Sequence, residues 1–139
     1  MLEYKHNPIE ACELKFSDDD WAVRGYASVF NSVDLVGDTI LPGAFQKSLE
    51  SGRTIKMYYE HLRFLKPGKW DTIQENEKGL DASGFLTRGH SLAQDVRAEM
   101  RHGTLTGMSI GFTIPNGGYE KTAGGGRIIK AVDLEEISF

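Results

Sequence analysis

The sequence contains little cysteine, no excess of positive charge and no long apolar run. Its single cysteine, Cys12, excludes an internal disulfide framework and a zinc site made of several cysteines. The formal net charge of -4 provides no basic footprint for nucleic acid. No stretch has the length of a transmembrane helix, and residues 1–6 lack the apolar core of a signal peptide. These absences predict a soluble, intracellular protein that binds neither nucleic acid nor membranes.

The 139 residues are expected to form one domain, residues 1–139, of mixed α+β class. The clearest helix covers residues 91–102, with Ser91 and Gln94 as a capping box and Gly103 as its stop. A shorter helix is expected over residues 44–50. Turn residues and β-propensity indicate strands at residues 11–17, 21–30, 53–60, 68–75, 80–88, 105–115 and 127–139. This order predicts a mostly antiparallel, barrel-like sheet of about seven strands with two or three packed helices.

Acidic residues gather in two irregular segments, where a metal site has to be weighed against turn chemistry. Residues 18–20 are three consecutive aspartates, whose side chains point in different directions in an extended turn. Asp34 and Asp38 have no third oxygen ligand at a suggestive spacing. Turns are therefore the favoured interpretation of both segments, and no metal or cofactor is predicted.

Ser109 stands in a Gly-x-Ser-x-Gly pattern, the spelling of a nucleophile elbow. An elbow requires a strand followed by a helix, whereas here helix signals precede Ser109 and strand signals follow it. The pattern is therefore either accidental or belongs to a nucleophile in another architecture. Gly107 and Gly111, which flank it, are compatible with a crowded strand and with close approach of a substrate backbone.

A nucleophilic serine needs a base, and four histidines are available. His6 is expected in a frayed end, while His90 and His102 flank the longer helix as solvated or capping residues. His61 alone ends a well-patterned strand and begins a loop, the position from which scaffolds present reactive side chains. By itself, a single histidine in this position favours a structural role, either at the surface or hydrogen-bonded.

A carboxylate is the best group to orient such an imidazole and to stabilise its cation. Glu136 lies in the apolar last strand, where an unpaired carboxylate would be costly. Its neighbour Glu135 is expected to point the opposite way. Glu136 is therefore the candidate third member, with Glu135 as the alternative.

Several blocks of the chain resemble the prohead maturation proteases of tailed phages. The blocks are residues 25–30 (GYASVF), Asp34, residues 37–45 (GDTILPGAF), 59–61 (YEH), 79–80 (GL), 105–112 (LTGMSIGF) and 134–139 (LEEISF). They follow the family's order and cover nearly the whole chain.

This resemblance implies a fold like that of the herpesvirus assemblin, a β-barrel with packed helices. It also implies a serine endopeptidase with Ser109 as nucleophile and His61 as base. The implied substrates are scaffold segments of the major capsid protein and the protease itself, cut inside an assembling procapsid in the host cytoplasm. Self-association into a homodimer or higher oligomer is a further expectation.

The resemblance leaves the third member open. Assemblins use a second histidine, whereas the phage proteases are expected to use an acidic residue near the final Glu-x-Ser block, which matches Glu136. Glu135 is the fallback and His90 comes third. Family members continue beyond this block, so the end at Phe139 predicts that a C-terminal propeptide or scaffold-like extension is missing.

Three other hypotheses remain at this stage. The chain could be a non-catalytic assembly or scaffold module with the same fold, an esterase of similar shape, or a plain β-barrel binding domain. The binding domain is favoured only if Ser109, His61 and the carboxylate lie far apart. The protease hypothesis requires the Ser109 hydroxyl within hydrogen-bond reach of a His61 nitrogen.

Overall fold

The computed structural model describes all 139 residues as three helices and eleven strands. The helices are α1 (Ile9–Cys12), α2 (Gln46–Glu50) and α3 (Ser91–His102). The strands are β1 (Glu3–Pro8), β2 (Lys15–Phe16), β3 (Ala22–Val29), β4 (Asp38–Ile40), β5 (Lys56–Tyr58), β6 (Gly68–Glu75), β7 (Gly79–Leu86), β8 (Gly107–Thr113), β9 (Tyr119–Lys121), β10 (Arg127–Ile129) and β11 (Asp133–Ser138).

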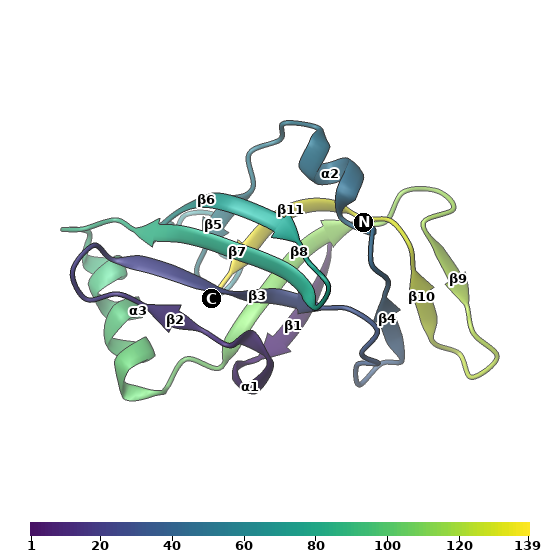
Figure 1. Ribbon diagram of the computed structural model, residues 1–139, viewed down its shortest axis with the longest axis horizontal. Coiled ribbons are helices and arrows are strands. Elements are labelled where there is room, and N and C mark those ends of the chain that lie inside the picture. The colour runs from purple at the N-terminus through teal and green to yellow at the C-terminus, as the bar shows by residue number, and fades with distance from the viewer.

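Eight strands form one curled sheet in the order β1-β8-β11-β5-β6-β7-β3-β2 (Figure 1). Its two ends approach each other, because Asn7 Nδ2 of β1 donates a hydrogen bond of 2.7 Å to the carbonyl of Tyr26 in β3. The sheet is therefore a partly closed barrel, as expected from the sequence. It has one more strand than expected, and β11 runs parallel to β5 while the other pairs are antiparallel.

A smaller sheet, in the order β4-β10-β9, lies at one end of the molecule, and α3 lies at the other (Figure 1). The segment expected as one strand over residues 127–139 is thus two strands in two different sheets, β10 and β11. The segment is interrupted between β10 and β11, where the chain passes from the small sheet to the large one. This division allows β11 to enter the middle of the large sheet between β8 and β5.

The core lies inside the curl of the large sheet. In β8, Met108, Ile110 and Phe112 alternate toward it and are at most 2% exposed. Helix α3 adds Ala93, Val96 and Met100 as an apolar stripe. The stripe has the helical spacing that predicts a helix from sequence, whereas β8 was expected from turn residues and β-propensity.

Three local expectations differ from the structure. The segment 11–17 is not a strand: it contains the end of α1, a residue with left-handed φ at Glu13 (48°), and the two-residue β2. Helix α3 is capped by His90, whose Nδ1 accepts from Leu92 N–H, so Ser91 is its first helical residue instead of its cap. His6 belongs to a paired strand, β1, instead of a frayed end.

None of the helices has the length and hydropathy that crossing a membrane requires.

Candidate active site

Ser109 lies in the middle of β8, between β1 and β11. Its side chain projects from the face of the sheet opposite to that of Met108 and Ile110, and the residue is 7% exposed. Its Oγ lies 2.7 Å from His61 Nε2 and 3.2 Å from the carbonyl oxygen of Lys5. Because the hydroxyl has one hydrogen, these two acceptors compete for it, and the shorter contact favours His61.

A tight turn directly after β5 presents His61. Both Glu60 (φ 55°) and His61 (φ 59°) adopt left-handed backbone conformations, which cost non-glycine residues about 1 kcal/mol each. Glu60 N–H donates to the carbonyl of Phe139 and Leu62 N–H donates to that of Tyr59, each at 3.0 Å. These bonds hold the turn so that the imidazole points across the sheet to β8.

The imidazole of His61 is fixed on two sides. Its Nδ1 lies 2.5 Å from Glu136 Oε1. The ring of Tyr4 packs against it, with 4.1 Å between ring centroids and 37° between planes. A carboxylate at Nδ1 favours the tautomer with hydrogen on that nitrogen, which leaves Nε2 as an acceptor for the Ser109 hydroxyl.

Glu136 is 3% exposed, and both of its carboxylate oxygens have partners. Oε1 meets His61 and Oε2 accepts a hydrogen bond from Ser138 Oγ. Such pairing offsets the cost of burying a carboxylate. Gly111, its partner residue on β8, leaves the space that the carboxylate occupies.

The two alternatives for the third position lie elsewhere. Glu135 pairs with Arg53 (Oε1 to Nη1, 3.2 Å), and its side chain is 39% exposed. An irregularity in register between Leu134 and Glu136 separates these neighbours, so Leu134 joins the core. His90 caps α3. The structure therefore brings Ser109, His61 and Glu136 together, and neither Glu135 nor His90.

Three further polar residues lie at this site that were not expected there from the sequence. Tyr4 and His6 come from β1, with His6 directly opposite Ser109 in the register. Ser138 comes from β11, also opposite Ser109. Alternation along residues 3–8 was the available signal for β1, but a single short polar strand at the beginning of a chain is weakly patterned.

Tyr59 anchors the turn that carries His61 to α3. Its phenol donates to Glu99, with Oη at 2.8 Å and 2.9 Å from the two carboxylate oxygens. This hydrogen bond, with burial, raises the pKa of Tyr59 to about 12. The phenol therefore stays a donor throughout the neutral range and connects the segment before His61 to the long helix.

Asp34 shapes the turn in which it lies, as expected from the sequence. Its Oδ1 accepts from Val36 N–H at 3.0 Å and from Asp38 N–H at 2.9 Å. Its Oδ2 lies 2.7 Å from Lys5 Nζ. Across the chain, no three His, Cys, Asp or Glu side chains are grouped as a metal ion requires.

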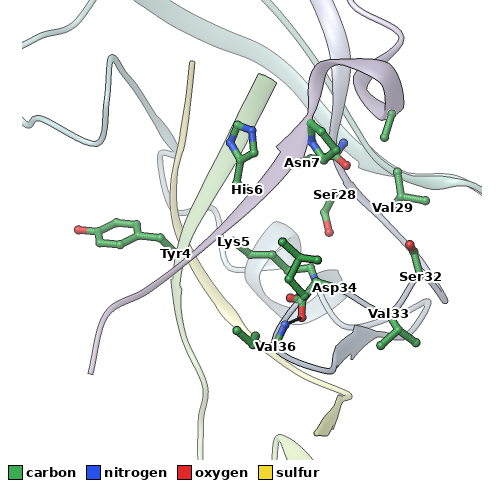
Figure 2. Close-up of a pocket in the computed structure, with 13 residues that line it drawn as sticks. Tyr4, Lys5, His6, Asn7, Ser28, Val29, Ser32, Val33, Asp34 and Val36 are labelled. Carbon is green, nitrogen blue, oxygen red and sulfur yellow. Dashed lines mark hydrogen bonds and ion pairs between the residues drawn. The ribbon is translucent and has the colours of Figure 1, made fainter. Parts of the chain in front are cut away.

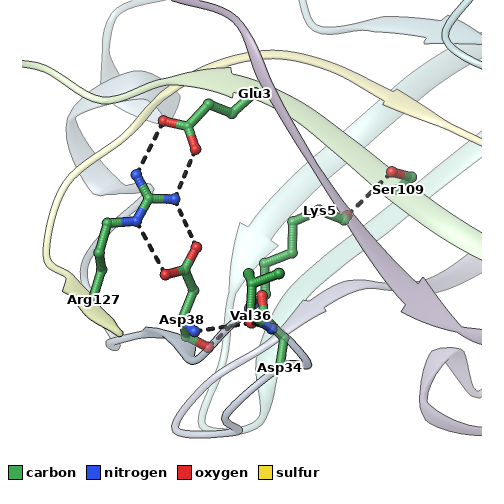
Figure 3. Close-up of polar contacts among 7 residues, drawn as sticks. All are labelled: Glu3, Lys5, Asp34, Val36, Asp38, Ser109 and Arg127. Carbon is green, nitrogen blue, oxygen red and sulfur yellow. Dashed lines mark hydrogen bonds and ion pairs between the residues drawn. The ribbon is translucent and has the colours of Figure 1, made fainter. Parts of the chain in front are cut away.

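Arg127 connects the small sheet to β1 (Figure 3). Its guanidinium bonds Asp38 of β4 through Nε (3.0 Å) and Nη2 (2.6 Å), and Glu3 of β1 through Nη2 (2.7 Å) and Nη1 (3.2 Å). Hydrogen bonds to Asp38 and then to Glu3 raise the pKa of Arg127. This network supports the strand whose Lys5 carbonyl contacts Ser109.

A groove of about 550 Å³ runs along β1 (Figure 2). Its lining comes from β1, from the end of β3 and from the loop over residues 32–36. Val33, Leu35 and Val36 of this loop are strongly exposed. An open, partly apolar groove thus lies one strand away from Ser109.

A hydroxyl, an imidazole and a buried carboxylate linked in series are the arrangement found in serine hydrolases. Here a strand of a curled sheet presents the hydroxyl, without the strand–turn–helix elbow of the α/β-hydrolases. The fold matches the solved structure of the bacteriophage T4 capsid assembly protease, with a TM-score of 0.67 at 11% identity, over 100% of this chain and 96% of the other. The barrel-like sheet with packed helices expected from the sequence is thus confirmed, and it matches the fold of a capsid assembly protease.

The chain belongs to the family described as Caudovirus prohead serine protease, whose model matches residues 8–139. It is 47% identical to the prohead protease of Enterobacteria phage HK97 in an alignment of 131 residues that covers 91% of this chain. The same alignment covers 58% of that relative, so the chain spans less than two thirds of its length. The family expected from the sequence blocks is confirmed.

Proposed function

We propose that this chain is a serine endopeptidase of phage procapsid maturation, with Ser109 as nucleophile, His61 as base and Glu136 as the group that orients the base. The observation that carries this proposal is the pair of contacts on one imidazole. Its Nε2 lies 2.7 Å from Ser109 Oγ while its Nδ1 lies 2.5 Å from Glu136 Oε1. Hydrogen-bond reach on both sides is the geometry that proton transfer from the hydroxyl requires.

Acylation follows from this geometry. Ser109 Oγ attacks the carbonyl carbon of a peptide bond while its proton passes to His61 Nε2. The resulting imidazolium is stabilised by the Glu136 carboxylate, which keeps its negative charge. The tetrahedral intermediate then collapses, the C–N bond breaks, and the proton on Nε2 goes to the leaving amine.

Deacylation uses the same groups with water as the nucleophile. His61 Nε2 accepts a proton from the water that attacks the ester on Ser109. The second tetrahedral intermediate breaks the bond to Oγ, and His61 returns the proton to Ser109. The enzyme is thereby restored and a carboxylic acid is released.

The proposed substrates are scaffold segments of the major capsid protein and the chain itself, cut inside the procapsid. The names of the relatives, a prohead protease and a capsid assembly protease, support this choice. Residues 1–139 would constitute the protease domain, and its self-association is part of the proposal.

The test is coexpression of the chain with the capsid protein of the same phage. Wild type is expected to convert the capsid protein to a shorter product, and Ser109→Ala is expected to leave it uncut. Ser91→Ala is the matched control, because Ser91 is exposed at the start of α3. Processing by Ser109→Ala at the wild-type rate would remove Ser109 from the mechanism. If the capsid protein stays uncut with wild type as well as with both variants, the result would favour a non-catalytic assembly module.

A further inference from the structure

The backbone N–H of Ile110, next to the nucleophile, is used by the sheet on the β1 side. Ile9 N–H donates to the Thr106 carbonyl at 2.9 Å, which makes these two residues a hydrogen-bonded pair. Hydrogen-bonded pairs alternate along an antiparallel ladder, so Lys5 and Ile110, opposite each other in the same register, are also such a pair. The N–H of Ile110 is therefore directed to Lys5.

The backbone N–H of Ser109 is used on the other side, by β11. Since Ser109 and His6 are a non-hydrogen-bonded pair, the N–H and C=O of Ser109 point away from β1. Phe139 N–H donates to Tyr58 of β5 at 3.2 Å, so the groups of the preceding residue, Ser138, face β8. Ser138 is the register partner of Ser109. The sheet thus occupies both backbone donors that flank the nucleophile.

An oxyanion nevertheless needs a donor as negative charge develops on the carbonyl oxygen. Removing one such donor typically slows the chemical step by about 10²- to 10³-fold. With the Ser109 and Ile110 N–H groups in the ladder, a side chain on the same face of the sheet can supply such a donor.

His6 is in position to supply this donor. It lies opposite Ser109, and members of such a pair project from the same face with Cβ atoms about 5 Å apart. Its ring leans over Gly107: a Cβ built there would be 2.9 Å from His6 Cε1 and 3.0 Å from Nε2. Figure 2 shows this side chain pointing away from Lys5 and Asp34.

The two histidines lie on opposite sides of Ser109 along β8. His61 is held by Tyr4 and Glu136, which are the two register partners of Gly111. His6 instead covers Gly107, two residues before Ser109. A carbonyl attacked by Ser109 would therefore have the base on one side and His6 on the other.

The His6 ring is also free to bind a ligand. The side chain is exposed. The hydrogen bonds that histidine rings make in this chain belong to His61 and His90, which leaves both nitrogens of His6 without a partner. An imidazole always carries at least one N–H, so a donor is present in either tautomer.

We propose that His6 donates a hydrogen bond to the carbonyl oxygen of the scissile peptide bond as that oxygen becomes an oxyanion. This role rests on the proposed function of Ser109. No proton is transferred by His6: the Oγ proton goes to His61, the π electrons of the carbonyl move to oxygen, and the His6 N–H stabilises them. His6 is thereby a catalytic residue contributed by the edge strand.

The test is steady-state cleavage of a peptide carrying the capsid-protein cleavage site by His6→Ala and His6→Gln, using the full chain. His6→Ala is expected to lower kcat by about 10²-fold with little change in KM. His6→Gln retains a side-chain N–H and is expected to recover part of kcat. A peptide aldehyde, which forms the tetrahedral adduct, should lose affinity for His6→Ala in proportion to the loss of kcat.

His102→Ala is the control, because His102 is exposed at the end of α3 and makes no side-chain hydrogen bond. Unchanged kcat in His6→Ala, or an increase in KM alone, would overturn the role of His6. Failure of the proposed function has a different signature, namely cleavage that persists in Ser109→Ala. Melting temperatures of both His6 variants should equal that of wild type, since the side chain is exposed.

Discussion

Gly111 lies directly beneath the carboxylate of Glu136. A Cβ at position 111 would be 2.4 Å from Glu136 Oε1 and 3.0 Å from its Cδ and Cγ. Since real Cβ atoms do not approach this closely, any side chain at position 111 must displace the carboxylate that contacts His61. The second glycine of the Gly-x-Ser-x-Gly pattern thus has a structural role that is unrelated to a nucleophile elbow.

Gly111→Ala is therefore expected to lower kcat by at least about 100-fold, because small displacements of positioning groups have effects of this size. Overpacking is expected to cost about 1–3 kcal/mol of unfolding free energy. Peptide cleavage and urea denaturation measure the two effects. Gly124→Ala is the control, since a Cβ at Gly124 meets no atom within 4 Å. Equal activity of the two variants would contradict the positioning role of Glu136.

Glu136→Gln and Glu135→Gln separate the two neighbouring carboxylates. Glu136→Gln is expected to lower kcat by about 10³- to 10⁴-fold, because an amide no longer stabilises the imidazolium or fixes its tautomer. Glu135→Gln removes only a half-exposed ion pair with Arg53 and is expected to leave kcat near wild type. Single-turnover cleavage measures both. A larger loss of kcat in Glu135→Gln than in Glu136→Gln would show that Glu135, and not Glu136, orients His61.

Arg127→Ala tests the connection between the small sheet and β1. It leaves the buried Asp38 without its cation, and we expect a loss of about 2–3 kcal/mol of unfolding free energy. Arg127→Lys keeps the charge but cannot bond both carboxylates through a planar guanidinium. The stability of this variant should therefore lie between that of wild type and that of Arg127→Ala. Urea denaturation is the measurement. Lys130→Ala, which breaks an exposed pair with Glu120, should change stability by less than about 1 kcal/mol.

Cys12 is expected to be unreactive in the folded chain. Burial raises the pKa of its thiol to about 11, and its Sγ donates to the carbonyls of Asn7 and Pro8. At pH 8 only about 0.1% would be thiolate, so a disulfide reagent should label it only in denaturant. Because the pKa of Cys12 is higher in the folded chain than in the unfolded one, the neutral buried thiol contributes fully to the unfolding free energy below pH 9. This contribution is lost as the pH rises to about 11. Rapid labelling at pH 8 without denaturant would contradict this expectation.

Local pattern determined much of the fold. The signals in residues 91–102, with the stop at Gly103, identified α3, and those in residues 68–75 and 80–88 identified the strands β6 and β7. These signals are local because helical and strand periodicities depend on which face of the same element is buried. Strand β1 has neither a strong apolar face nor a preceding turn, so it became visible only through its pairing with β8.

By itself, the sequence determined the family, the candidate serine and the candidate histidine, because these depend on residue identities in a fixed order. Only the tertiary structure placed Ser109 against His61, 48 residues earlier in the chain, and selected Glu136 over Glu135. It also placed His6 opposite Ser109. The physical reason is that register, a one-residue irregularity in β11 and the curl of the sheet are properties of pairings between distant segments. No window of sequence contains both partners of such a pairing.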